Sequence, residues 1–365
     1  MREADLMAER TMLFTGGNGF LGKRIIANFL EKNMHIVLLT QEKFVQETET
    51  LIADFQSIPD CKAQLSYAVG DITQPNVGLI AEDIEALKLN CTDAFHLAAA
   101  YNLALDKSIG ERINVQGTRN TMELLAALPN LRRLGYMSTT SISGVHKGLF
   151  SEEDFNIGQK FKNYYESSKF EAESIVREYR DRIPTIIFRP TIVVGDSVSG
   201  EIEKIDGPYY GFVMISRNLH IAIQKSGNTK CHIAPVDFVT DAIAAIYENA
   251  NASGKVFHVG DPNALLYDDF FDLACERWGK FKPVLKLPPG LMGKLLDIPF
   301  IEKSFGVLKE SFPYTHLPVE YDFNNTLAAL NGTGLECPAV PEYLDVMIDY
   351  FKNHLNKKKL KKHRW

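Results

Sequence analysis

The stretch TMLFTGGNGFLG, residues 11–22, decides the fold of this 365-residue chain. Its first part, Thr11–Thr15, is a short apolar run that predicts a strand buried on both faces. The residues from Phe20 to Glu31 predict a helix. A strand that passes directly into a helix is typical of the βαβ units that build a parallel sheet.

The turn between this strand and this helix is rich in glycine. Gly16, Gly19 and Gly22 follow the pattern G-x-x-G-x-x-G, and Gly17, Gly19 and Gly22 also satisfy G-x-G-x-x-G. Glycines in this setting permit a tight turn and let backbone N–H groups approach a pyrophosphate at the positive end of the helix. Glycine-rich turns are common, so a purely structural turn stays open as an alternative.

Strand-like apolar runs and longer amphipathic stretches alternate through the first half of the chain, and the second strand is predicted at His35–Thr40. Later strands are predicted at Leu65–Val69, Ala94–Ala98, Leu134–Ser138 and Thr185–Arg189. Each is almost continuously apolar, as a strand buried on both faces should be, and the spacing suits crossover helices. The sequence therefore predicts an α/β fold with a Rossmann-type, doubly wound parallel sheet.

After about Pro190 the alternation weakens and Gly and Pro become more frequent. Short strands are expected at Lys230–Ala234 and Val256–Val259, with a helix at Phe238–Asn249 between them. We expect residues 1–195, with returning segments at about 230–260, to form the dinucleotide-binding domain. A smaller, mainly helical substrate-binding region is expected at about 196–229 and 261–352, followed by a basic tail at 353–365.

Composition and charge exclude several classes of protein. The chain has 40 Lys and Arg against 46 Asp and Glu, a net charge of −6, which argues against a nucleic-acid-binding protein. Five widely spaced cysteines include no C-x-x-C pair, and their odd number indicates a reducing, cytoplasmic location. The N-terminal MREADLMAER lacks the apolar core of a secretory signal, and no apolar run is long enough to span a membrane.

The residues that would contact the ribose 2′-hydroxyl follow the second strand. An acidic residue normally stands at this strand end, but here the sequence is Thr40-Gln41, followed by Glu42 and Lys43. Because no carboxylate at the strand end repels a 2′-phosphate and Lys43 is near enough to attract one, the sequence favours NADP. Glu42 leaves NAD open, and Lys43 is equally well explained as a solvated charge at the start of a helix.

Two sets of polar residues are candidates for catalysis. Tyr165 and Lys169 are four residues apart, so they share one face of a predicted helix. An adjacent ammonium favours the phenolate and lowers the pKa of a tyrosine, which makes it a better acid and base at neutral pH. The hydroxyl row Ser138–Ser141 follows a predicted strand at the expected ligand crevice, although a capping turn explains the same row.

Seven motifs occur in one order: TGGNGFLG, GDIT with Asp71, HLAA from His96 to Ala99, NVQGT from Asn114 to Thr118, MSTTSISG, YESSK, and RPTIVVG from Arg189 to Gly195. Together they resemble the extended short-chain dehydrogenase/reductases. The resemblance implies that the glycine turn holds the pyrophosphate of NADP and that Asp71 bonds the adenine amino group. The cofactor-binding residues expected on this basis are Gly16, Asn18, Gly19, Phe20, Leu21, Gly22, Thr40, Lys43, Asp71, Ile72, Ala98, Ala99, Tyr165, Lys169, Pro190 and Thr191.

The same resemblance implies the catalytic roles. Tyr165 would donate or accept the proton on the substrate oxygen, and Lys169 would bond the nicotinamide ribose and depress the pKa of the tyrosine. Asn114 would support the active-site helix. Thr140 would polarise the substrate oxygen, because it lies 25 positions before Tyr165, the spacing typical of the family.

Within that family, the sequence is most similar to the fatty acyl-CoA reductase and thioester reductase subgroup. The stretch Pro190–Val194 lacks the Asn usual in nucleotide-sugar epimerases and dehydratases, and the DGPYY stretch, Asp206–Tyr210, fits the reductase subgroup. The resemblance implies an NAD(P)H-dependent oxidoreductase that reduces an acyl thioester or a carbonyl on a lipophilic substrate. A hydroxysteroid-type alcohol dehydrogenase, a nucleotide-sugar enzyme and a non-catalytic NAD(P)-binding protein are the alternatives.

The expected partner is a small lipophilic or acyl molecule, with no nucleic acid and no metal ligand, and the chain is expected to be a monomer or a homodimer. The last fourteen residues hold seven Lys and Arg and no acid, which leaves 33 basic against 46 acidic residues elsewhere, a net charge of −13. Leu355, Leu360 and Trp365 among these lysines would suit contact with an anionic membrane. A solvated, disordered end is the favoured explanation of the tail.

Overall fold

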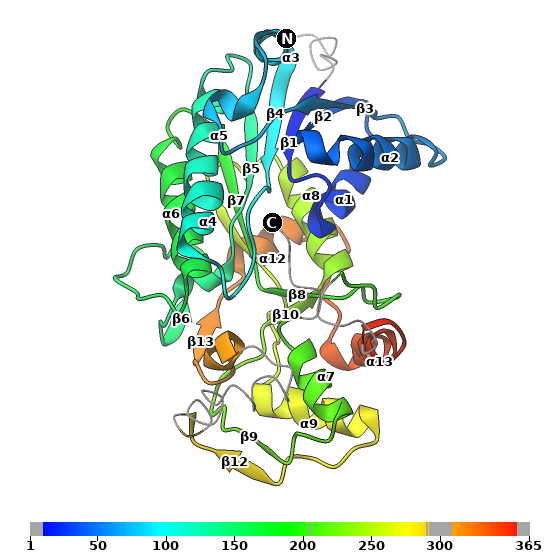
Figure 1. Cartoon of the computed structure of the whole chain (residues 1–365), viewed down its shortest axis with the longest axis vertical. Helices are drawn as coiled ribbons and strands as arrows, with labels where there is room; N and C mark the ends of the chain where they lie inside the picture. Colours follow the sequence, from blue (N-terminus) through cyan, green and yellow to red (C-terminus); the bar gives the residue numbers. More distant parts are fainter. Residues whose placement is uncertain (1–9, 204–205, 290, 292–308, 356–365) are drawn as a thin grey trace.

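The computed structural model describes residues 10–203, 206–289, 291 and 309–355 (Figure 1). Its centre is a seven-stranded sheet of parallel neighbours in the order β11-β7-β5-β4-β1-β2-β3. The strands are β1 (Arg10–Thr15), β2 (Met34–Thr40), β3 (Gln64–Val69), β4 (Cys91–His96), β5 (Arg133–Met137), β7 (Thr185–Pro190) and β11 (Val256–Val259). From β1 the chain adds strands toward one edge of the sheet, and from β4 it adds them toward the other edge. The crevice at the carboxyl ends of β1 and β4 is therefore the switch point where doubly wound sheets bind ligands.

Helices cover both faces of this sheet (Figure 1). Met12 and Phe14 of β1 face one core, and Leu13 faces the other, as the two-residue period of a strand requires. The first core is closed by α1 (Phe20–Ala27), α2 (Val45–Gln56) and α8 (Val236–Glu248). The second core is closed by α3 (Ala81–Asn90), α5 (Gly117–Ala126) and α6 (Tyr164–Glu178).

A third core lies beyond the carboxyl ends of the strands, in the lower part of Figure 1. Phe212 lies at its centre, among α7 (Tyr209–Ser216), α9 (Tyr267–Trp278) and α13 (Val340–Tyr350). Two small parallel pairs join this region to the rest: β6 (Gly148–Phe150) with β13 (Val319–Tyr321), and β8 (Ile192–Val194) with β10 (Ile233–Pro235). A third pair, β9 (Ala222–Gln224) with β12 (Leu285–Leu287), lies at the lower end of the region itself (Figure 1). The remaining short helices are η2 (Glu42–Phe44), η3 (Pro75–Gly78), α4 (Lys107–Ile109), η4 (Gly110–Gln116), η5 (Thr140–Ser143), η6 (Lys309–Thr315), α12 (Asn324–Leu330) and η7 (Phe351–Leu355).

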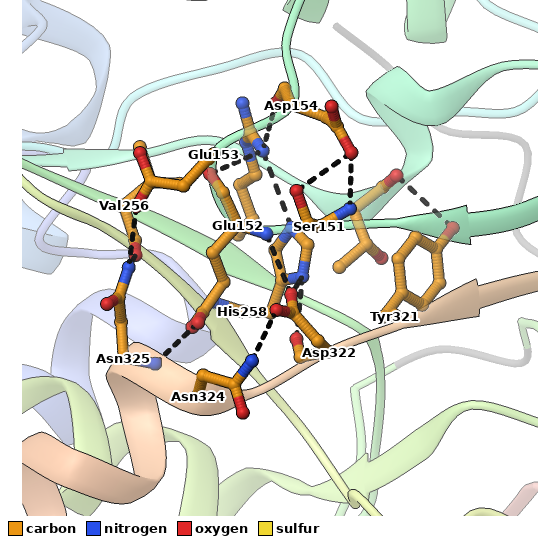
Figure 2. A network of polar contacts seen from close by, with 12 residues as sticks. Ser151, Glu152, Glu153, Asp154, Val256, His258, Tyr321, Asp322, Asn324 and Asn325 are labelled. Carbon is orange, nitrogen blue, oxygen red and sulfur yellow. Dashed lines mark hydrogen bonds and ion pairs between the residues drawn. The ribbon is translucent and has the colours of Figure 1, made fainter.

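A polar network attaches β13 and α12 to the edge of the sheet (Figure 2). The buried carboxylate of Glu152 accepts hydrogen bonds from the backbone N–H of His258 on β11 at 2.9 Å and from that of Asn325 on α12 at 2.6 Å. The backbone N–H of Glu152 donates to the carboxylate of Asp322 at 2.8 Å. Glu152 thus connects segments that lie far apart in the sequence, and it holds the C-terminal segment with α12 against the edge strand β11.

The predicted α/β fold with a doubly wound parallel sheet is confirmed, with shifts at the element ends. The helix predicted to reach Glu31 ends at Ala27, because the chain tightens into successive turns in which Asn28 N–H donates to Ile25 O and Phe29 N–H to Ile26 O. The strand predicted at Lys230–Ala234 is the shorter β10, which pairs with β8 outside the main sheet. The strand predicted at Val256–Val259 is β11, and it pairs with β7.

Candidate active site

The glycine turn leaves no room for side chains at two positions. Gly16 has a φ of +79°, and a Cβ built there would lie 2.7 Å from the backbone nitrogen of Ala98. A Cβ at Gly22 would collide with the carbonyl oxygen of Gly16. Both glycines are therefore required by the close approach of the turn to the β4 end and of α1 to the turn.

This turn opens into a cavity of about 1440 Å³ at the switch point of the sheet. The cavity exceeds the usual range for a single small-molecule pocket, roughly 300–1,000 Å³, so it has room for two ligands at once. All the residues predicted to bind the cofactor line it, from Gly16 to Thr191. The cradle of glycines and the continuous groove thus fit a dinucleotide.

The groove beside β2 is held by a chain of side-chain contacts. Asn18 Nδ2 donates to Thr48 Oγ1 at 2.7 Å, and Thr48 Oγ1 is 2.8 Å from Thr40 Oγ1. Lys43 lines the cavity with its ammonium 4.8 Å from the centre of the Phe44 ring. Because these contacts fix the turn against the second strand, the groove is shaped before any ligand enters.

The helix α6 carries Tyr165 and Lys169 on one face, as the spacing predicts. The helix begins at the N-cap Asn163, whose side chain accepts the Glu166 N–H at 3.0 Å. Tyr165 is buried, and the ring of Tyr101 stands edge-on to it with centroids 4.8 Å apart. Both tyrosines line the cavity, so the candidate acid lies in its wall.

The ammonium of Lys169 is held by the end of β5 and not by the phenol of Tyr165. Lys169 Nζ donates to the Met137 carbonyl at 2.7 Å and to Tyr136 OH at 3.3 Å. Burial lowers the pKa of Lys169 to about 8, although nearby Glu173 favours the charged form. Burial raises the pKa of Tyr165, and a hydrogen bond with Thr139 lowers it. The pKa of Tyr165 is raised overall, because burial outweighs the contact with Thr139, and its depression by Lys169 stays a prediction.

The structure places the hydroxyl of Thr139 in hydrogen-bond contact with Tyr165. Thr139 lines the cavity and forms a side-chain hydrogen bond with Tyr165, whereas Thr140 is not among the cavity-lining residues. Thr140 Oγ1 instead donates to the Pro190 carbonyl at 3.3 Å. The η5 turn starts at Thr140 with Thr139 as its N-cap, so the chain turns between the two threonines. The catalytic role of Thr140 stays a prediction, and Thr139 is a second candidate for it.

Asn114 is predicted to support the active-site helix, and the structure places it in contact with that helix. It is buried on η4 outside the cavity lining, where its Oδ1 accepts the Ala100 N–H at 2.7 Å and its Nδ2 donates to Ser168 Oγ at 2.9 Å. These contacts tie α6 to the segment after β4. Asn114 thus supports the active-site helix without contact to the space where a ligand would lie.

A buried charge cluster fixes α6 behind the catalytic residues. Glu173 lies one turn beyond Lys169, and its carboxylate is 2.6 Å from Arg189 Nη2 and accepts a hydrogen bond from Ser138 Oγ at 2.6 Å. Burial would favour the neutral acid, but Arg189, Arg177 and Ser138 outweigh it and lower the pKa of Glu173 to about 2. The ends of β5 and β7 are therefore locked to the helix that carries Tyr165.

Sequence reasoning missed several residues of the site. Tyr101 and Asp206 are hydrogen-bonded to each other through their side chains, and both line the cavity beside Tyr165. Tyr314 on η6 lines it too, and its hydroxyl donates to buried Glu166 at 2.5 Å. Asp206 belongs to the DGPYY stretch that relates the sequence to the reductase subgroup. No motif around Tyr314 indicated that it belongs to the site.

Two sequence-based expectations concern membranes. Among the residues that the structure describes, no helix has the length and apolar character needed to cross a membrane. The basic tail predicted at 353–365 lies outside the described residues from 356 onward.

A ligand groove built on a glycine turn, opening at the switch point beside a Tyr-x-x-x-Lys helix, is the arrangement of an extended short-chain dehydrogenase/reductase, a class of NAD(P)-dependent oxidoreductases. Comparison with known proteins narrows this class. Residues 14–243 match the NAD-binding family described as male sterility protein, and the chain belongs to that family.

Two curated relatives illustrate the family. Fatty acyl-CoA reductase wat of Drosophila melanogaster is 26% identical over 277 residues, which cover 65% of this chain and 54% of that protein. One protein of the linear gramicidin synthase of Brevibacillus parabrevis is 26% identical over 373 residues, which cover 96% of this chain and 7% of that protein. The chain thus spans about half the length of the fatty acyl-CoA reductase and corresponds to a small part of the synthase protein.

Among solved structures, the terminal R domain from the myxalamid PKS-NRPS biosynthetic pathway has the same fold. The two share a TM-score of 0.76 and 23% sequence identity, over 94% of this chain and 91% of that chain. The fold therefore extends through the C-terminal region, beyond the part that the family model matches.

Proposed function

We propose that the protein is an NADPH-dependent reductase of an acyl thioester, or of a carbonyl group, on a lipophilic substrate. The observation that carries this proposal is the continuity of the cavity, which runs from the glycine turn past Tyr165 into an apolar chamber. The chamber is lined by Ile202, Pro208, Tyr210, Met214, Ile223, Tyr267, Phe271 and Phe312. Such a wall favours an acyl chain over the polar diphosphate of a nucleotide sugar.

We assign each residue of the site a role in the proposed reaction. The glycine turn and Asp71 would hold the dinucleotide, whose nicotinamide supplies the hydride when it is bound. Tyr165 would donate the proton to the substrate oxygen, and Thr139 would hold that oxygen within reach. Lys169, on the same helix and in the same cavity wall, would bond the nicotinamide ribose.

The preference for NADP rests on the end of β2. Lys43 lines the groove, and Thr40 at the strand end carries no charge that would repel a 2′-phosphate. Glu42 lines the same groove and opposes the preference. We therefore propose NADP as the favoured cofactor on the strength of the strand-end residue.

The proposal extends to the layout and setting of the chain. Residues 1–195 with about 230–260 would bind the dinucleotide, and 196–229 with 261–352 would bind the substrate, since the apolar chamber is built mainly from the latter. The five cysteines are unpaired, which supports a reducing, cytoplasmic setting.

A screen of NADPH oxidation against acyl-CoAs, long-chain aldehydes, ketosteroids and UDP-sugars tests the proposal. We expect consumption with an acyl-CoA or an aldehyde, and Tyr165→Phe should abolish it while NADPH binding persists. Consumption only with UDP-sugars, or full turnover by the Tyr165→Phe variant, would overturn the proposal.

A further inference from the structure

Two buried polar atoms in the cavity wall have no hydrogen-bond partner among the residues that the structure describes: Thr191 Oγ1 and His232 Nδ1. Thr191 lies between β7 and β8, and His232 directly precedes β10. Because β8 pairs with β10 in the register Ile192↔Ile233, the two residues are neighbours, and the Ile192 N–H donates to the His232 carbonyl at 3.1 Å. Both residues thus lie side by side and line the same cavity.

The tautomer of His232 follows from its other nitrogen. His232 Nε2 is 3.3 Å from the Val319 carbonyl, which can only accept, so Nε2 carries the hydrogen. Nδ1 is then a lone-pair acceptor. The side chain is only 8% exposed, and burial lowers its pKa to about 4, so the ring stays neutral at physiological pH. The edge contact with the Tyr321 ring, with centroids 4.8 Å apart, holds the imidazole in place.

Thr191 offers a complementary group. Its residue is 6% exposed, and its backbone N–H donates to the Val259 carbonyl at 2.9 Å. A Cβ built on Gly260 would lie 2.5 Å from Thr191 Oγ1 and Cγ2, so this glycine is what lets the threonine side chain fit. The hydroxyl is therefore packed into the wall, where it can donate as well as accept.

Leaving such groups unpaired in the folded protein costs free energy, and native structures rarely keep them so without a reason. We infer that Thr191 and His232 form a subsite for an amide group of a bound ligand, with His232 Nδ1 accepting from its N–H and Thr191 Oγ1 donating to its carbonyl. An amide carries both a donor and an acceptor, as this pair requires. The inference rests on the proposed function, which offers two amide sources: the carboxamide of the nicotinamide and an amide in the arm that bears the thioester.

Binding measurements on the full chain distinguish these sources without any need for turnover. The first arm compares Kd values of NADPH and its 3-acetylpyridine analogue, whose acetyl group cannot donate a hydrogen bond. The second arm measures the Kd of an acyl-CoA by calorimetry, with the matching fatty aldehyde, which has no amide, as reference. Variants His232→Phe and Thr191→Val remove one partner each, and His232→Asn retains an amide acceptor as the conservative replacement.

The chain offers matched controls, because His220 Nδ1 and Thr229 Oγ1 are also buried without a partner in the described part of the chain but do not line the cavity. His220→Phe and Thr229→Val should leave all Kd values unchanged. If the carboxamide is the ligand, His232→Phe should weaken NADPH binding about tenfold and remove its advantage over the analogue, with partial rescue by His232→Asn. If the substrate amide is the ligand, the same variant should instead weaken acyl-CoA binding about tenfold and leave the aldehyde unaffected.

Unchanged Kd values in both arms, or equal losses in the control variants, would overturn the inference. A wild-type protein that binds these ligands as expected but shows no NADPH oxidation would refute the proposed function and leave the subsite standing. Circular dichroism of each variant checks that the fold is retained, and His232→Asn provides a reading if His232→Phe does not fold.

Discussion

Replacing Thr139 by valine should lower kcat by about 100- to 1,000-fold, the usual cost of removing one preorganised donor from a reacting oxygen. In the structure Thr139 lines the cavity and hydrogen-bonds with Tyr165, so the substitution removes both the group that would hold the substrate oxygen and a contact that lowers the pKa of the tyrosine. Thr139 Oγ1 also accepts the Ser141 N–H at 3.1 Å as an N-cap, and its loss should cost about 1 kcal/mol of stability.

The neighbouring Thr140→Val is the matched control. Its hydroxyl makes a long, 3.3 Å bond to the Pro190 carbonyl outside the cavity lining, so the substitution should cost about 1 kcal/mol of stability and leave kcat nearly unchanged. Initial rates of NADPH oxidation, measured together with urea unfolding, separate the two effects. A large loss of kcat in Thr140→Val together with normal activity in Thr139→Val would refute the reasoning and support the assignment made by counting positions.

Four further results are expected. The kcat/KM should fall as the pH rises through about 8, because the buried Lys169 has its pKa lowered to about 8 and loses its charge there; a profile flat to pH 10 would contradict this. In the same range stability should rise with pH, since the unfolded chain keeps the lysine proton up to about pH 10.4. Glu173→Gln should lower the free energy of unfolding by about 3–5 kcal/mol in urea titrations, because it leaves the fully buried Arg189 without its carboxylate; a loss below about 1 kcal/mol would show the pair to be dispensable. Lys43→Glu should raise the KM for NADPH about tenfold relative to that for NADH, and an unchanged ratio would remove Lys43 from 2′-phosphate recognition.

The fold could be predicted from the sequence because local pattern and global topology agree. The apolar run of β1 fills two cores at once, and the glycines after it admit a single kind of turn, so strand, turn and helix were readable from twelve residues. The ends of the helices could not be predicted as well from the sequence. The tightened turns after Ala27 depend on how Phe29 and Leu30 pack into the core, and a helical pattern in the sequence does not contain that information.

The residues of the candidate site also fall into those that the sequence could place and those that it could not. Residues on regular elements, such as Tyr165 and Lys169 on α6, could be placed by spacing because the helix fixes their geometry. Spacing is a weaker guide for Thr140, because the chain turns into η5 at that point and equal spacing no longer means equal direction. Tyr101 and Tyr314 come from segments whose approach to Tyr165 is set by tertiary packing, so their roles required coordinates.

The position of β11 affects how the chain can fold while it is being made. The strand pairs with β7 at the sheet edge, yet about 70 residues separate Pro190 from Val259, and synthesis of that length takes roughly 4–14 s. During this interval β7 is an apolar strand with an unpaired edge, a template for wrong pairing with other chains. The face that α8 later covers is also open to water during that time. The dinucleotide-binding half is thus not a self-sufficient folding unit, and a fragment that stops near residue 195 should aggregate unless the remainder of the chain is supplied.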